Sequence, residues 1–257
     1  TEWSGYKVHL TESCEAGLPH LITNIETTAA TTTDYEMTPT VHAHLAEREV
    51  LPAEHFVDTG SITADQLVDS QQDYAVELVG PVQTENSWQA RANEGFASGD
   101  FVLDWEAQQA TCPRGQTSRT WRVEQLPDQA AELRIRFAPA DCQACPTRAK
   151  CTKSQTLPRQ LTLRGTQAAF EALQSARQQQ QTQAWQVRYR TRAGVEGTLS
   201  QATNPLAMRE ARYCGQTKTH LQLAFTAAAM NLMRVANWLA EVPLAQTRTS
   251  HFAALAA

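Results

Sequence analysis

The sequence predicts an α/β fold, in which helices flank a mixed β-sheet and a β-rich, cysteine-containing insertion interrupts that core. Two observations carry this prediction: strand-type alternation and helical spacing succeed one another in residues 1–82, whereas short strands with turn residues dominate residues 83–160. Length is a third, because 257 residues that are 42% apolar suffice for one large domain or two modest ones. We therefore expect a folded, layered protein.

The elements of the predicted core follow the order strand, strand, helix, strand, helix, strand. Tyr6, Val8 and Leu10 alternate with more polar neighbours, and residues 20–28 are rich in β-branched side chains, so these two stretches should form a hairpin. The predicted strands are residues 3–10, 20–28, 54–58 and 74–82, and the predicted helices are residues 34–49 and 64–70. This order implies helices packed on a mixed sheet.

The rest of the chain divides into the β-rich insertion, residues 83–160, and a helical part, residues 161–257, that returns to the core. Residues 133–137 alternate as a strand within the insertion, and residues 217–241 form the longest predicted helix. Core packing is the simplest interpretation of the apolar stripe on that helix. We expect the stripe to face the interior, and it consists of Leu221, Phe225, Ala228, Leu232, Val235 and Leu239.

Charge divides the sequence more sharply than the total of -5 suggests. Residues 1–111 hold 3 basic and 19 acidic side chains, whereas residues 112–257 hold 19 basic and 8 acidic ones. Most of the basic side chains are arginines, whose guanidinium groups suit phosphate oxygens, so the second part could form a polyanion-binding surface. The alternative is a solvated face that neutralises the acidic part.

Four cysteines lie within forty residues of the insertion, at Cys112, Cys142, Cys145 and Cys151. Four thiolates can hold zinc tetrahedrally, and the short C-x2-C step is common in such sites. These residues predict a zinc site or the remnant of one. The alternative is four reduced, partly buried thiols, because we expect a cytoplasmic protein, in which disulfides are rare.

The residues most suggestive of chemistry are Asp58, at the end of a short predicted strand, and the group Tyr189, Arg192 and Glu196. On a helix, spacings of three and four residues place the last three on one face. A carboxylate at a strand end that meets one on a helix face can hold a hard divalent cation for phosphoryl transfer. The alternative for Glu196 is a surface ion pair with a neighbouring arginine.

At these residues the sequence resembles bacterial insertion-sequence transposases of the DDE type. Residues 54–60, EHFVDTG, look like the strand that carries their second Asp, and Tyr189, Arg192 and Glu196 match their Y-(2)-R-(3)-E element. The opening WSGYKVH, the block TKTHLQ at residues 217–222 and the cysteine-bearing insertion are also similar. Several motifs in the right order make the resemblance specific.

The resemblance implies a ribonuclease H-like core in which three carboxylates hold two Mg²⁺ (or Mn²⁺) ions for DNA strand cleavage and strand transfer. Asp58 and Glu196 would be two of these carboxylates, and Tyr189 and Arg192 would contact DNA phosphates. It also implies binding of transposon ends and target DNA, and a homodimer that pairs two ends. Further DNA contacts are expected from Arg188, Arg190, Arg212 and Lys218.

Two departures from the family pattern stand out. Thr203 occupies the position, seven residues after the Glu, where the wider family has a Lys, so Arg209, Arg212 or Lys218 would have to supply that contact. The first Asp of the family belongs to a strand before the Tyr6 strand, whereas the sequence begins at Thr1, and no motif places Glu2, Glu12 or Glu26 at the metal. We therefore expect the C-terminal portion of a transposase, without the N-terminal DNA-end-binding region and inactive by itself.

Three other functions remain open on sequence grounds. The chain could be a non-catalytic module that binds DNA or a transposase subunit, a stand-alone metal nuclease of similar fold, or a structural zinc protein. The seven histidines suggest surface residues, and His55 could lie near Asp58 without acting there. No stretch approaches the roughly 20 apolar residues of a membrane span and no signal peptide is evident, so we expect a cytoplasmic location.

Overall fold

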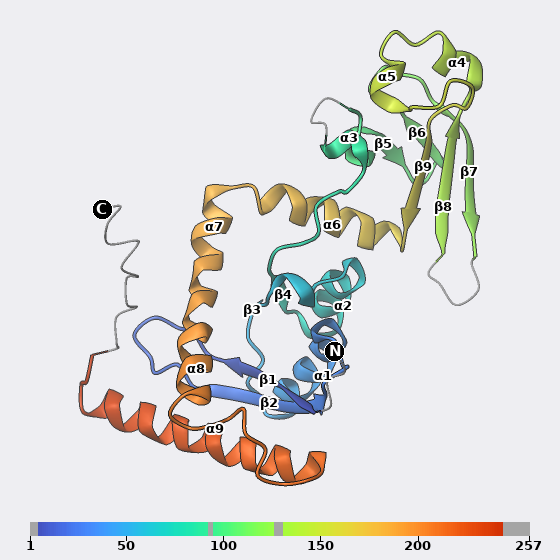
Figure 1. Ribbon diagram of the computed structural model, residues 1–257. Coiled ribbons are helices and arrows are strands. Elements are labelled where there is room, and N and C mark those ends of the chain that lie inside the picture. The colour runs from blue at the N-terminus through green and yellow to red at the C-terminus, as the bar shows by residue number, and fades with distance from the viewer. Residues whose placement is uncertain (1–4, 92–94, 126–130, 244–257) are drawn as a thin grey trace, which may run out of the picture. The chain divides into compact units, whose positions relative to one another are not determined.

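The computed structural model describes residues 5–91, 95–125 and 131–243, which form helices and several small β-sheets (Figure 1). The chain divides into two compact units. The first unit comprises Thr1–Ser61, Tyr74–Gly80 and Gln186–Ala257, and the second comprises Ile62–Asp73 and Pro81–Trp185. The chain therefore leaves the first unit after Ser61, passes through it again at Tyr74–Gly80, and returns to it at Gln186, shortly before Tyr189.

The first unit contains an antiparallel and a parallel pair of strands. The antiparallel pair is β1 (Tyr6–Glu12) with β2 (Ile22–Ala29), and the parallel pair is β3 (Glu54–Phe56) with β4 (Glu77–Val79). Its helices are α1 (Asp34–Glu47), the short 3-10 helices at Thr59–Ser61 and Arg190–Ala193, α8 (Gly194–Thr203) and α9 (Gln216–Leu239), and α7 (Gln183–Tyr189) enters it at residue 186.

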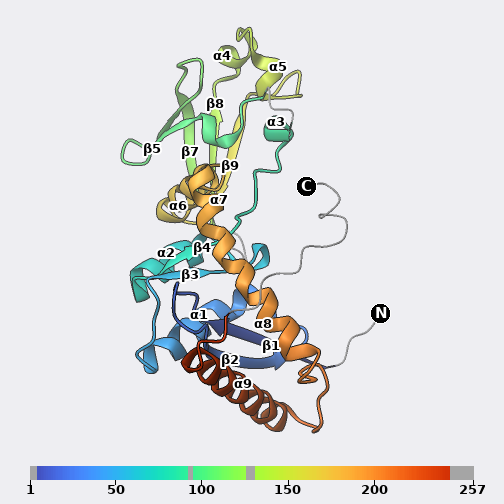
Figure 2. The same ribbon diagram turned by 90° about the vertical axis from the view of Figure 1, so that its left-hand side faces the viewer.

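The β1–β2 hairpin is covered on both faces (Figure 2). A carboxylate oxygen of Glu26 lies 2.6 Å from Nδ1 of His44 in α1. The hydroxyl of the next residue, Thr27, lies 3.2 Å from Nδ1 of His220 in α9. Successive side chains of a strand point to opposite faces, so α1 and α9 lie on opposite faces of β2. The main apolar cluster lies on the α9 face and includes Ile22, Leu223, Ala227 and Met230.

The second unit is built around a three-stranded antiparallel sheet. Its strands are β7 (Ser118–Glu124), β8 (Glu132–Phe137) and β9 (Gln160–Arg164), and a smaller pair is formed by β5 (Val102–Asp104) and β6 (Gln109–Thr111). Its helices are α2 (Ala64–Tyr74, up to residue 73), α3 (Trp88–Arg91), the 3-10 helix Ser98–Asp100, α4 (Pro139–Gln143), α5 (Arg148–Cys151) and α6 (Gln167–Gln179). Phe101, Ile135 and Phe137 lie in its core.

The observed elements match the predicted order, with two differences. In the part of the chain that the structure describes, the strands form four separate small sheets, whereas the sequence predicts one mixed sheet for the core. The predicted inward face of α9 is wrong: Leu221, Phe225, Leu232 and Leu239 are between 57% and 73% exposed. The buried residues of α9 are Thr219, Leu223, Ala227 and Met230, because this helix carries a second, less apolar stripe that packs on β2.

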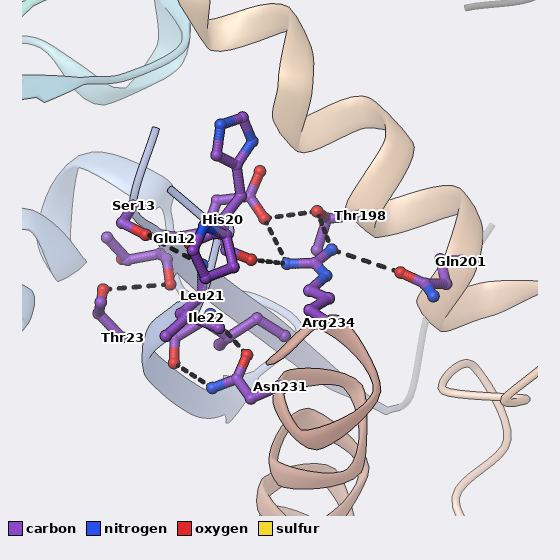
Figure 3. Close-up of polar contacts among 12 residues, drawn as sticks. Glu12, Ser13, His20, Leu21, Ile22, Thr23, Thr198, Gln201, Asn231 and Arg234 are labelled. Atoms are coloured by element: carbon purple, nitrogen blue, oxygen red, sulfur yellow. Dashed lines mark hydrogen bonds and ion pairs between the residues drawn. The ribbon is translucent and has the colours of Figure 1, made fainter. Parts of the chain in front are cut away.

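A buried ion pair joins three elements of the first unit (Figure 3). Arg234 of α9 donates to Glu12 at the end of β1 over 3.1 Å, and Thr198 of α8 donates to the same carboxylate and accepts from Arg234. The side chains of Glu12 and Arg234 are 6% and 16% exposed. One turn earlier on α9, the Asn231 amide bonds both the N–H and the C=O of Ile22, each over 2.8 Å. These contacts fix α9 and α8 against the hairpin.

Substitution of Arg234 should destabilise the first unit strongly. Arg234→Met leaves the Glu12 carboxylate buried without its cation, so we expect the free energy of unfolding to fall by about 3 kcal/mol. Urea unfolding measures it, with exposed Arg209→Met as the matched control. A loss below about 0.5 kcal/mol, the size expected of an ordinary surface substitution, would contradict this role of the pair.

Candidate active site

One guanidinium group brings together the two carboxylates that the sequence analysis singled out. Arg192 lies 3.2 Å from the Asp58 carboxylate through Nη2, and its Nη1 donates to Glu196 over 3.2 Å. Asp58 follows β3, whereas Arg192 and Glu196 stand in consecutive helical turns after α7. Residues 138 positions apart in the sequence therefore share a single cation.

Tyr189 anchors the same helical segment to the strand. Its hydroxyl donates to the Val57 carbonyl over 3.1 Å, next to Asp58 in the chain. Burial raises the pKa of the Tyr189 hydroxyl above its usual value, and the nearby Asp58 and Glu196 carboxylates contribute to the increase. Tyr189, Arg192 and Glu196, spaced by three and four residues, thus lie together near the end of β3.

The two carboxylates are open to solvent although they are ion-paired. The side chains of Asp58 and Glu196 are 65% and 62% exposed, whereas that of Arg192 is 22% exposed. Exposed pairs of this kind are worth little in stability, so an incoming cation can replace the guanidinium at small cost. The arrangement is chemically suited to hold a hard divalent cation between oxygen ligands.

A groove leads to this pair of carboxylates. It has a volume of about 630 Å³ and runs between β1 and β3, with apolar side chains of α1 and α8 along it. Val8, Leu10, Val41, Phe56 and Val195 contribute to its lining, and both Asp58 and Arg192 border it. The sequence analysis did not anticipate this groove, because it is a space between elements.

The other candidate phosphate-binding residues differ in their availability. Arg188 is committed to two acidic side chains, Glu77 at 2.6 Å and 2.8 Å and Glu54 at 2.8 Å, and its pKa is raised chiefly by the hydrogen bonds that it donates to Glu77. Arg190, Arg212 and Lys218 are exposed. The latter three can therefore reach a phosphate more easily than Arg188.

None of the alternative carboxylates named from the sequence joins Arg192 in the described part of the chain. Glu12 is buried with Arg234, and Glu26 is bonded to His44. Glu2 lies outside the described residues. Within the described residues, no group of three or more His, Cys, Asp or Glu side chains is already arranged to hold a metal ion.

Comparison with protein families identifies the segment that carries Tyr189, Arg192 and Glu196. Residues 111–236 match the family model described as a transposase DDE domain. This segment, about half of the chain, is therefore similar to transposase DDE domains. No curated protein and no solved structure matches the chain.

The match accounts for the second half of the candidate site and for the cysteines. It contains the helical segment with Tyr189, Arg192 and Glu196 and the four cysteines of the second unit, and it begins after Asp58. A transposase DDE domain implies transposition of DNA and DNA binding, and such domains generally use divalent metal ions. Among the helices that the structure describes, none is long and apolar enough to span a membrane.

Two histidines under the candidate site are not the surface residues that the sequence suggested. His42 of α1 is 1% exposed, and its Nε2 lies 2.9 Å from Nδ1 of the partly buried His55 in β3. Burial lowers the pKa of His42, and burial together with the neighbouring His42 lowers the pKa of His55 to about 4. The amphipathic pattern of α1 could not reveal this pair, because histidine fits either face of a helix.

The stability of the fold should depend on pH through His55. Its pKa is 6.5 in the unfolded chain and lower in the fold, so the unfolded state binds the extra proton and the free energy of unfolding falls as the pH drops from about 6.5 to about 4. His55→Gln should flatten this dependence in urea unfolding at pH 7 and pH 5, whereas His20→Gln should leave it unchanged. An unaltered slope in His55→Gln would show that another group causes the dependence.

Proposed function

We propose that this chain supplies two of the three metal-binding carboxylates of an insertion-sequence DDE transposase that cleaves DNA strands and joins them to a target. The observation that carries the proposal is the convergence of Asp58, Arg192 and Glu196 at the end of β3. The family match over residues 111–236 supports the same function independently of that geometry.

The donor set fits a divalent cation such as Mg²⁺ or Mn²⁺. Asp58 and Glu196 offer exposed carboxylate oxygens to one point, where a positive group already lies between them. When bound, two such ions would supply an activated water or 3′-hydroxyl and stabilise the leaving oxygen. Asp58 and Glu196 would hold them together with a third carboxylate.

Arg192 and Tyr189 have distinct tasks in this proposal. Arg192 neutralises Asp58 and Glu196, and once cations do so its guanidinium is free to bind a DNA phosphate at the same place. Tyr189 positions the helical segment through the Val57 carbonyl. Exposed Arg190, Arg212 and Lys218 extend the positive surface along the DNA backbone.

We assign the groove between β1 and β3 to a further β-strand, upstream of Thr1, that carries the third carboxylate and completes a ribonuclease H-like sheet. Support comes from two unpaired strand edges. Ala30 N donates to Gly5 O, and hydrogen-bonded residues alternate along an antiparallel strand, so the odd-numbered residues of β1 face β2. The backbone N–H and C=O groups of even-numbered Val8 and Leu10 therefore point away from β2. Val57 N donates to Val79 O, so Phe56 turns its backbone groups away from β4. All three residues border the groove.

This arrangement also organises the chain into domains. Residues 1–82 and 161–257 form the two parts of the catalytic core, and residues 83–160 form the insertion with the cysteine cluster. The two compact units divide the chain differently, because Ile62–Asp73 and residues 161–185 belong to the second unit, but Asp58 and Glu196 share the first.

The proposal requires that the chain be inactive without the added strand. We expect an upstream-extended chain to nick supercoiled plasmid in the presence of Mn²⁺, the present chain not to do so, and Glu196→Gln to abolish nicking by the extended chain. Hydrogen exchange at Val8, Leu10 and Phe56 should slow in the extended chain and in its Glu196→Gln variant. Unchanged exchange at these amides would disprove the assignment of the groove.

Two outcomes separate catalysis from a mere binding role. If the extended chain protects those amides and binds transposon-end DNA but never nicks, the chain is a non-catalytic DNA-binding or subunit-binding module. If the present chain nicks plasmid by itself, another carboxylate completes its site and the need for the added strand is wrong.

We also propose that the exposed stripe of α9 binds the same stripe of a second copy. The spacing of the stripe alternates between four and three residues, which is the pattern of a helix that packs along another helix. The flanking Gln222, Ala229 and Asn231 are uncharged, so two identical helices can meet without repulsion. A dimer would bring together two sites, as the pairing of two DNA ends requires.

This dimer should dissociate when charge enters the stripe. Phe225→Lys with Leu232→Lys should halve the mass measured by analytical ultracentrifugation, because four ammonium groups would have to be buried per interface. Val123→Lys, at an exposed apolar residue of β7, is the matched control. A monomeric wild type, or a dimer that resists the double substitution, would refute this interface.

A further inference from the structure

The four cysteines of the second unit line one small cavity. Cys112 lies just after β6, Cys142 in α4, Cys145 after α4 and Cys151 at the end of α5. The cavity has a volume of about 30 Å³, and all four residues border it. Three separate segments of the chain thus place cysteines at the border of one cavity, although the thiols are not yet arranged around a common point.

Tight turns shape the backbone on both sides of this cavity. Gly115 N donates to Cys112 O over 2.8 Å, and Gly115 adopts a positive φ of 81° that glycine tolerates best. Opposite this turn, Cys145 N donates to Cys142 O over 3.4 Å, and Arg148 N donates to Cys145 O over 3.1 Å. Each turn wraps the chain around a cysteine rather than continuing a strand or a long helix.

The thiols are not explained by packing alone. Cys112, Cys142 and Cys151 contact the apolar cluster around Phe101 and Phe137, but Cys145 is not part of that contact. Protein interiors leave few voids, and a void bordered by four partly buried, unbridged thiols is not the expected product of close packing. Burial raises the pKa of the Cys151 thiol to about 11, and the three neighbouring cysteines raise it further, which is consistent with their proximity.

We propose that Cys112, Cys142, Cys145 and Cys151 bind one zinc ion as a structural Cys₄ site. Zinc takes four thiolates in tetrahedral geometry with Zn–S distances of about 2.3 Å, and the thiol side chains have to rotate inward to reach it. Each thiol gives its proton to solvent, so four thiolates around Zn²⁺ carry a net charge of -2.

Three arginines, Arg114, Arg148 and Arg159, border the cavity together with one acidic residue, Asp141, so positive charge is available to offset that of the ion and its ligands. Arg159 donates to the carbonyl of Cys151 over 3.1 Å. Arg148 donates to the Ser154 and Leu157 carbonyls, which holds the segment after α5 in place. The ion would then clamp the end of β6 to α4 and α5, in a part of the chain that has little apolar core of its own.

Zinc content tests the proposal on the full chain purified under reducing conditions without added metal. We expect about one zinc ion per chain by mass spectrometry of the metal, and a loss of at least tenfold in Cys145→Ser. Cys214→Ser, at an exposed cysteine of the first unit, should retain the ion. Because some variants could fail to fold, wild-type protein stripped by a chelator provides a second test: one equivalent of Co²⁺ should produce thiolate charge-transfer absorption.

Other outcomes would overturn the site. Absence of zinc together with absence of the Co²⁺ absorption, or zinc that persists in Cys145→Ser, would exclude these ligands. Fewer than six reactive thiols in the denatured, unreduced chain would favour disulfides instead. These measurements do not depend on DNA cleavage, so they stand or fall separately from the proposed transposase activity.

Discussion

The buried pair of Glu12 and Arg234 is the interaction on which the first unit depends. Helix α8 carries Glu196 in its first turn and Thr198 two residues later, and Thr198 bonds both members of the pair. The position of Glu196 relative to the hairpin is therefore set by a contact that takes no part in the proposed chemistry. The bonds of Asn231 to Ile22 fix the position of α9 along β2. Helix α9 therefore contacts both the hairpin, through Asn231, and the helix that carries Glu196, through Arg234.

The contrast between the two carboxylate–arginine clusters explains why one is structural and the other available. Glu12 is nearly inaccessible and receives bonds from Arg234 and Thr198, and removal of either donor would leave a buried charge. Asp58 and Glu196 are mostly exposed and share one arginine, so that arginine can be exchanged without a large penalty. The same residue types thus stabilise the fold where they are buried and stay available to a ligand where they are exposed.

The sequence predicted local structure and singled out Asp58 and Glu196, which both contact Arg192, but it did not predict the arrangement of faces and edges. Strand alternation located β1 and β2, and the helical spacing of Tyr189, Arg192 and Glu196 placed them together. The wrong face of α9 arose because hydrophobicity alone does not tell a core stripe from an exposed stripe. His42 was misjudged as a surface residue, and the ion pair of Arg188 with Glu77 was not foreseen, because their partners, His55 and Glu77, are distant in sequence.

The path of the chain suggests why the second unit needs a stabilising device of its own. Asp58 precedes that unit and Tyr189 follows it, so the candidate site residues meet only because the chain returns to the first unit at Gln186, after the more than one hundred residues of Pro81–Trp185. The entropy lost in bringing together the two ends of so long a segment is smaller when the segment between them is folded rather than flexible. The three-stranded sheet anchors β7 to β9, whereas the segments around α4 and α5 contribute short helices and few buried residues. A metal clamp at the four cysteines would order these segments without any demand on the geometry of Asp58, Arg192 and Glu196.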